Sequence, residues 1–241
     1  KKLLEKQQDG KEPHKRLAAP KTWQINRKSS KWVSKPNPGT HNIESCMSMG
    51  TVLTEIIKIC KNSREVKYLI SENKVKVDGI VRKDKKFPVG LMDILAVGDK
   101  CYRILFNKKG KLIAKSITKE ESKIKPKKII NKTSLKGNKL QINLFDGTNF
   151  ISSKNDMDTY DTLVFSEGKI KEKIDFKEGS YVYVLKGKQK GKSGILKKLP
   201  EDKNLQSKKI IFNDGKDDHE TLKDYVFVIG KTKPVISLPN E

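Results

Sequence analysis

The fold is decided by the segment Glu44–Lys83, which reads ESCMSMGTVLTEIIKICKNSREVKYLISENKVKVDGIVRK. A helical repeat in its first half is followed directly by a hairpin signal in its second half. The helical repeat consists of apolar residues at i, i+3, i+4, i+7, i+8 and i+11, namely Met49, Val52, Leu53, Ile56, Ile57 and Cys60. This spacing places these side chains on one face and predicts an amphipathic helix that packs against a partner.

A second helix and a hairpin are predicted directly after the first helix. Asn62 is a favourable N-cap residue, and Glu65, three residues later, is the returning carboxylate of a capping box. The apolar stripe of this second helix consists of Val66, Leu69 and Ile70. Two alternating strands, Lys74–Val77 and Ile80–Arg82, then flank Asp78-Gly79, a two-residue turn whose glycine accepts a positive φ.

The polar side of this helix–helix–hairpin unit is strongly basic. Its cations are Lys58, Lys61, Arg64, Lys67, Lys74, Lys76, Arg82 and Lys83, with few opposing acids. The arrangement resembles the S4 RNA-binding domain, in which a short helix pair and a β-turn grip folded RNA. That domain occurs in ribosomal proteins, some pseudouridine synthases, a heat-shock protein and certain tRNA synthetases. We therefore expect an S4-like domain over residues 43–87. Such a domain indicates RNA as the class of ligand, but it does not identify the protein.

The composition favours several small domains with cationic surfaces between them. Hydrophobic residues make up 34% of the 241 residues and charged residues another 34%, which is little apolar material for one large core. The 53 lysines and arginines exceed the 29 acids by 24, and this excess predicts a polyanionic partner. No run approaches the ~18 apolar residues that span a bilayer. We expect nucleic acid as the partner, with no membrane and no small-molecule substrate.

Residues 1–42 are predicted to form a basic arm rather than a domain. They have no sustained hydrophobic period, contain several prolines, and carry many more bases than acids. The segment His14–Lys21 and Trp23 combine cations with an aromatic ring, a composition that lies along phosphates and stacks on an exposed base. The alternative for Trp23 and Trp32 is packing against the neighbouring domain. Lys1–Lys11 lacks the apolar region of a secretory signal.

Short strands dominate the chain beyond the hairpin. Turn residues such as Asn107–Gly110 and Asp146-Gly147 separate β-rich runs at short intervals. These runs are Leu91–Val97, Cys101–Phe106, Lys111–Ile117, Lys139–Phe145, Thr148–Ile151, Thr162–Phe165 and Lys169–Ile174. Strands at such spacing predict a small β-barrel or sandwich over residues 88–173.

The last section, residues 174–241, carries a motif of its own. The strand Tyr181–Leu185, the glycine-rich loop Lys186–Gly194 and the strand Ile195-Leu196 resemble the KOW motif of SH3-like barrels in ribosomal proteins and transcription factors. The matching positions are Gly179, Val182, Val184, Gly187, Gly191, Gly194 and Leu196. Lysines alternate with the loop glycines, so the loop backbone can approach phosphate closely. The alternative is that the glycines only build the turn.

The sequence predicts neither catalysis nor a metal site. The loop nearly spells a phosphate-binding P-loop at Gly191-Lys192-Ser193, but Lys186 stands where the first glycine is needed and Pro200 cuts off the helix. Neither the histidines nor the cysteines have the paired spacing of metal ligands; they are His14, His41, His219, Cys46, Cys60 and Cys101. Asp156–Asp161 has polar neighbours and is typical of a solvated loop. We expect a non-enzymatic protein without a cofactor.

Taken together, these segments resemble a known family along nearly the whole chain. The arm His14–Trp23, the S4-like unit, the run Phe87–Ile94, the KOW segment and the ending Phe227–Pro239 are similar to the small-subunit ribosomal protein S4 family of the eukaryotic and archaeal type. This resemblance implies a structural constituent of the small ribosomal subunit that binds ribosomal RNA and neighbouring ribosomal proteins. It also implies a cytoplasmic location in the ribosome, with assembly in the nucleolus if the source is eukaryotic.

By position in this family, three groups of residues are expected to contact RNA. They are Lys15, Arg16, Lys21 and Trp23 in the arm, Asn62, Arg64 and Lys67 at the second helix, and Lys186, Lys188, Lys190 and Lys192 in the glycine-rich loop. We expect the groups to engage different RNA helices at once and to hold those helices together. Two alternatives remain: a KOW-containing transcription or elongation factor, and an RNA-modifying enzyme or its accessory chain.

Overall fold

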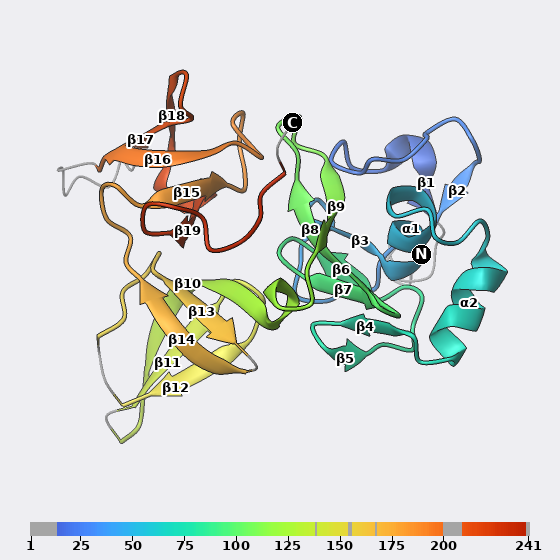
Figure 1. Cartoon of the computed structure of the whole chain (residues 1–241), viewed down its shortest axis with the longest axis horizontal. Helices are drawn as coiled ribbons and strands as arrows, with labels where there is room; N and C mark the ends of the chain where they lie inside the picture. Colours follow the sequence, from blue (N-terminus) through green and yellow to red (C-terminus); the bar gives the residue numbers. More distant parts are fainter. Residues whose placement is uncertain (1–13, 138, 154–155, 167, 200–208, 240–241) are drawn as a thin grey trace, which may run out of the picture.

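Three antiparallel five-stranded sheets make up most of the molecule (Figure 1). The computed structural model describes residues 14–239, except 138, 154–155, 167 and 200–208. Two short two-stranded pairings, β1 with β2 and β3 with β6, complete the sheets of the described chain. The prediction of a mainly β fold with few helices is confirmed.

The first helix is shorter than predicted. It consists of α1, Met49–Thr51, and a π-helical continuation, Val52–Ile56. Lys58 has a φ of 60°, in the left-handed region, and this ends the helix before Cys60. The Cys60 amide donates instead to the Leu53 carbonyl oxygen at 3.3 Å, and the Cys60 side chain stays buried. The apolar spacing therefore predicted the burial of Cys60 correctly, but it placed the C-terminal end of the helix too late in the chain.

The second helix agrees with its sequence signals. It is α2, Ser63–Ser71, with Val66 and Ile70 buried. The Asn62 side-chain oxygen accepts from the amides of Arg64 and Glu65 at 2.9 and 3.0 Å. The Glu65 carboxylate returns to the Lys61 amide at 2.7 Å, one residue before the N-cap, so the capping box is present with a shifted partner.

The first sheet joins the predicted hairpin to three later strands. Its order is β5-β4-β7-β8-β9, with bounds Ile80–Val81, Val75–Val77, Ile94–Val97, Lys100–Phe106 and Leu112–Ile117. Asp78 and Gly79 have φ angles of 51° and 79°, as the predicted turn requires. We expected a separate β domain from residue 88, but β7 pairs with β4, so the sheet crosses that boundary. An isolated two-stranded hairpin cannot bury Val75 and Val77, which explains the recruitment of further strands.

The second and third sheets each combine pairings of consecutive strands with one long-range pairing, β10 with β13 in the second and β15 with β19 in the third. The second has the order β12-β11-β10-β13-β14, with bounds Asn149–Ser152, Lys139–Leu144, Ile124–Leu135, Thr162–Ser166 and Lys169–Ile174. The third has the order β18-β17-β16-β15-β19, with bounds Asp218–Leu222, Lys209–Asn213, Ser193–Lys198, Tyr181–Val184 and Val226–Gly230. One apolar cluster lies within the second sheet, and another joins Val164 and Ile174 of the second sheet to apolar side chains of the third.

The described part of the predicted arm is folded against the first sheet. Residues 14–42 contain β1, His14–Lys15, and β2, Trp32–Val33, which pair with each other, and a 3-10 turn at Arg16–Ala18. Trp23 is 2% exposed and belongs to the same core as α1 and β8. Residues 14–42 of the predicted basic arm thus pack against the first sheet, and residues 1–13 lie outside the described chain.

The remaining short elements connect these parts. β3, Cys46–Ser48, pairs with β6, Pro88–Gly90, beside the first sheet. Two further 3-10 turns, Glu121–Lys123 and Lys223–Tyr225, precede β10 and β19. In Figure 1, α2 lies at one end of the molecule and the third sheet at the other, with the β8–β9 hairpin between them.

Candidate nucleic-acid interface

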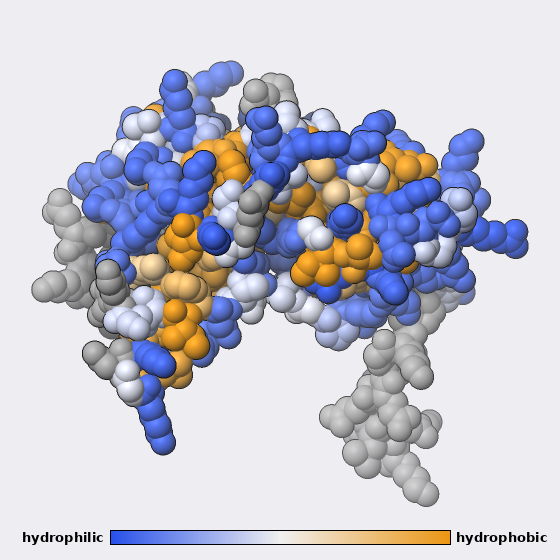
Figure 2. All heavy atoms as spheres, turned by 60° about the horizontal axis from the view of Figure 1, so that its bottom comes forward, coloured by the Kyte–Doolittle hydropathy of each residue, from blue (hydrophilic) through white to orange (hydrophobic). Residues whose placement is uncertain are grey.

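The first group of predicted RNA contacts lies on the outer surface of α2. Asn62, Arg64 and Lys67 are all exposed. Asn62 uses its side-chain oxygen to cap the helix, which orients the first turn that carries Arg64. Figure 2 shows hydrophilic side chains over this end of the molecule. The helix thus presents two exposed cations on a rigidly capped turn.

The hairpin and the α1–α2 connection add cations to the same end. Lys58, Lys61, Lys74, Lys76 and Lys83 are exposed. The Lys74 ammonium lies 5.9 Å from the centroid of the Tyr68 ring, and Tyr68 is itself 60% exposed on α2. An exposed aromatic beside a lysine is suited to an unpaired base and a phosphate. Tyr68 was not among the predicted contacts. Its place outside the apolar stripe of the second helix was the sequence signal that could have identified it as an exposed aromatic.

The arm divides into exposed and buried residues. Lys15 and Lys21 are exposed, as a phosphate contact requires. The Arg16 guanidinium is buried, where it forms an ion pair with Glu55 and donates to the Asn26 carbonyl oxygen at 2.7 Å. The Trp23 indole nitrogen donates to the Ile43 carbonyl oxygen at 3.1 Å, deep in the core. Arg16 and Trp23 therefore hold the arm in place, and Trp23 follows the packing alternative and not base stacking, because its ring is enclosed.

The lysines of the glycine-rich loop also differ from one another. Lys186 and Lys188 are exposed. The Lys190 ammonium lies 3.8 Å from the centroid of the Phe106 ring, and burial lowers the pKa of Lys190. The Lys192 ammonium lies 3.1 Å from His219 Nε2 and donates to it in the tautomer that carries the ring proton on Nδ1. Lys186 and Lys188 are thus the two loop cations directed to solvent, whereas Lys190 and Lys192 fix the loop to its surroundings.

The structure brings the arm and the loop to opposite sides of the β8–β9 turn. The Leu112 amide of β9 donates to the Thr22 carbonyl oxygen of the arm at 2.7 Å. On the other side, a Cβ atom at Gly191 would lie 1.9 Å from the Asn107 carbonyl oxygen, so the loop backbone touches the turn. The turn carries three exposed lysines that the sequence analysis did not predict as RNA contacts, Lys108, Lys109 and Lys111.

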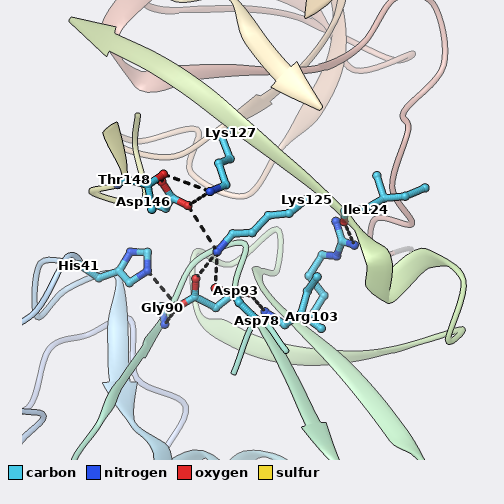
Figure 3. A network of polar contacts seen from close by, with 11 residues as sticks. His41, Asp78, Gly90, Asp93, Arg103, Ile124, Lys125, Lys127, Asp146 and Thr148 are labelled. Carbon is cyan, nitrogen blue, oxygen red and sulfur yellow. Dashed lines mark hydrogen bonds and ion pairs between the residues drawn. The ribbon is translucent and has the colours of Figure 1, made fainter. Parts of the chain in front are cut away.

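A buried polar network joins the arm, the first sheet and the second sheet (Figure 3). The Asp93 carboxylate accepts from His41 Nε2 at 2.9 Å and from the Lys125 ammonium at 2.8 Å. Lys125 also donates to the Asp78 carboxylate at 2.6 Å. Burial raises the pKa of Asp93, but the hydrogen bond from His41 and the charge of Lys125 outweigh it and hold this pKa at about 2. A shared cation between two carboxylates fixes the orientation of the sheets.

A second buried lysine lies between the second and third sheets. Lys128 is 5% exposed, and its ammonium donates to the Asp224 and Val226 carbonyl oxygens at 3.0 and 2.6 Å. Burial lowers the pKa of Lys128, the charge of Asp224 opposes this, and the charges of Lys186 and Lys223 add to it, so that the pKa is about 8. These bonds join β10 of the second sheet to the start of β19 in the third sheet.

The described residues contain neither a metal-ion cluster nor a membrane-spanning helix. Among them, no three His, Cys, Asp or Glu side chains lie close enough together to hold a metal ion. No helix in the described parts of the chain is long and apolar enough to cross a membrane. The exposed ammonium and guanidinium groups of this surface can make electrostatic contacts with anions.

Comparison with known proteins agrees with this picture. Three family models match in succession: the RS4NT (NUC023) domain at residues 10–44, the S4 domain at residues 52–95 and ribosomal family S4e at residues 98–172. Small ribosomal subunit protein eS4 of Archaeoglobus fulgidus is 41% identical over 231 residues, covering 93% of this chain and 97% of the relative. The chain belongs to the ribosomal family S4e. The corresponding protein of Methanocella arvoryzae is 40% identical over 226 residues, covering 92% of this S4e chain and 95% of the relative.

A solved structure supports the S4e assignment at the level of the fold. The crystal structure of the 30S ribosomal protein S4e from Thermoplasma acidophilum superposes with a TM-score of 0.69 at 29% identity, covering 78% of this chain and 96% of that one. The predicted membership of this family is thus confirmed, and with it the prediction of a structural, non-enzymatic protein. The first sheet spans the junction between the S4 and S4e matches, because β7 ends at Val97 and β8 begins at Lys100.

Proposed function

We propose that this S4e chain is a structural constituent of the small ribosomal subunit that binds ribosomal RNA at several points. The observation that carries the proposal is the placement of exposed cations on rigidly joined sheets, with Arg64 and Lys67 on α2 and Lys186 and Lys188 in the loop between β15 and β16, beside the β8–β9 hairpin. Each contact alone binds weakly, but linked contacts raise one another's effective concentration, with gains of ~10² or more. The protein then holds RNA segments in a fixed relation and performs no chemistry on them.

The proposal also covers the fold of the third sheet, the residues that contact RNA, the protein neighbours and the location. The third sheet is an SH3-like barrel of the KOW type, supported by the order strand β15, glycine-rich loop and strand β16, and by φ angles of 82° and 85° at Gly187 and Gly191. The contacts are with phosphates of small-subunit ribosomal RNA through Lys15, Lys21, Arg64, Lys67, Lys186 and Lys188. Neighbouring small-subunit proteins share the remaining surface. The site of action is the cytoplasmic ribosome, with nucleolar assembly if the source is eukaryotic.

Sucrose-gradient fractionation of a native lysate tests this function. The chain is expected to sediment with the small subunit and to remain there after a high-salt wash, because linked contacts must all be released before the chain dissociates. Sedimentation apart from the small subunit would refute the assignment to the ribosome. The double variant Lys186→Glu with Lys188→Glu should lower incorporation several-fold without unfolding, since both residues are exposed in a loop. Lys171→Glu, an exposed residue of edge strand β14, is the matched control and should incorporate normally.

A further inference from the structure

Three chain segments that are far apart in the sequence meet at the tip of the β8–β9 hairpin. They are the arm around Lys21, the turn Asn107–Lys111 and the loop Lys186–Lys192, seen in Figure 1 around the hairpin in the middle of the molecule. The turn contains three lysines, the loop contains four, and neither contains an acid. The meeting point therefore concentrates positive charge that no single segment has.

The contacts between the three segments are short and specific. Thr22 accepts from the Leu112 amide at 2.7 Å, which places Lys21 beside the base of the turn. On the other flank, the Lys190 side chain covers the Phe106 ring at 3.8 Å. Below the loop, the Tyr183 hydroxyl bonds both backbone groups of Phe106, at 2.7 and 2.8 Å, so the third sheet cannot shift along β8.

The internal bonds of the loop direct its free cations outward. Lys190 and Lys192 are engaged with Phe106 and His219, and Glu44 is the carboxylate whose charge reaches Lys190. The cations of this meeting point that remain exposed are Lys21, Lys108, Lys109, Lys111, Lys186 and Lys188. Chain segments in lateral contact lie ~5 Å apart, so this group spans roughly 15–20 Å.

We propose that the arm, the β8–β9 turn and the glycine-rich loop form one composite surface that binds the backbone of a single RNA helix. This inference rests on the proposed function, and it replaces the expectation that the arm and the loop engage different helices. A nucleic-acid duplex carries about one phosphate charge per 1.7 Å of axis, counting both strands, so a segment of ~20 Å offers enough phosphates for every exposed lysine of the surface. Two separate helices, each with its own phosphate charge, would repel each other across so narrow a surface.

Directed hydroxyl-radical cleavage tests the composite surface. An iron chelate is attached through cysteine in three full-length variants, Lys21→Cys, Lys109→Cys and Lys188→Cys, each assembled with small-subunit ribosomal RNA. The background carries Cys101→Ser, because Cys101 is partly exposed while Cys46 and Cys60 are buried. Lys67→Cys on α2 reports RNA contact at the far end of the molecule, and Lys171→Cys on β14 is the position expected to give weak cleavage.

The composite surface predicts overlapping cuts from positions 21, 109 and 188 within one RNA helix, and cuts from position 67 elsewhere. Cuts from positions 21 and 188 in two different helices would overturn the inference and leave the proposed function standing. Cleavage from position 67 alone would also overturn it, because the composite surface would then face something other than RNA. No cleavage from any position would refute the proposed function itself.

A salt titration gives an independent measure of the same surface. Neutralising Lys21, Lys109 and Lys188 together with glutamine should reduce the slope of log affinity against log salt by about three, since each phosphate contact contributes about one. Lys171→Gln should leave the slope unchanged. A triple variant with the wild-type slope would show that these lysines do not touch phosphate.

Discussion

The phenol of Tyr183 donates to the Phe106 carbonyl oxygen at 2.8 Å and accepts from the Phe106 amide at 2.7 Å. Tyr183 lies on β15 of the third sheet, and Phe106 ends β8 of the first sheet. Both residues are almost fully buried, and burial raises the pKa of Tyr183 well above its usual range. One side chain thus satisfies both backbone groups of a residue in another sheet and fixes the position of the glycine-rich loop.

Removing this hydroxyl should weaken the joint between the sheets. Tyr183→Phe leaves a buried amide and a buried carbonyl of Phe106 without a partner, at a cost of about 1–3 kcal/mol in the free energy of unfolding. Urea unfolding and the exchange rate of the Phe106 amide measure the effect. The control is Tyr181→Phe, whose half-buried hydroxyl lies 3.2 Å from Ser193 and whose loss should cost less. Equal losses from both variants would contradict the role of Tyr183.

The close approach of the loop to the β8–β9 turn predicts a difference between two glycines. Gly191 and Gly179 have similar φ angles of 85° and 83°, so alanine is strained at both by roughly 1–2 kcal/mol. At Gly191 the added Cβ would also meet the Asn107 carbonyl oxygen at 1.9 Å, whereas at Gly179 it meets nothing within 4 Å. Gly191→Ala should therefore destabilise clearly more than Gly179→Ala in thermal unfolding. It should also lower RNA binding, because the loop must move away from the turn.

The Asp93 network should make stability fall in acid. The pKa of Asp93 is about 2 in the folded protein and about 3.9 in an unfolded chain, so the folded state favours the ionised form. This contribution, on the order of 2 kcal/mol, is complete above pH ~4 and is lost as the pH falls toward ~2. Asp93→Asn should remove this part of the acid dependence. Asp78→Asn should retain it, since burial, followed by the charge of Asp93, raises the pKa of Asp78.

Lys128 should make stability rise with pH in the alkaline range. Its pKa is about 8 when folded and about 10.4 when unfolded, so the unfolded chain binds more protons between these values. Stability relative to a Lys128→Met variant should therefore rise from pH ~8 to pH ~10, by roughly 3 kcal/mol. Denaturant unfolding of both proteins across this range gives the difference. Lys186→Met should shift the rise to higher pH, because it removes one of the charges that lower the pKa of Lys128.

The sequence correctly predicted the features that form between residues close together in the chain. The cap at Asn62, the turn at Asp78-Gly79 and the alternation of Val75 and Val77 need only short-range bonds and the period of the chain. Sequence resemblance also identified the family, because its motifs occur in order along nearly the whole chain. The end of the first helix was missed, because the left-handed φ of Lys58 is not encoded by apolar spacing.

Tertiary structure alone decided which candidate cations remain free to bind. Arg16 and Lys190 carry the positive charge expected of a phosphate contact. Inside the protein, however, Arg16 pairs with Glu55 and Lys190 lies over the Phe106 ring. The lysines of the β8–β9 turn became candidates only when long-range pairing placed them between the arm and the loop. The sequence by itself determined the family, the strand-rich composition and the excess of 24 positive charges. Packing decided where that charge meets solvent, because burial and pairing depend on residues that are distant along the chain.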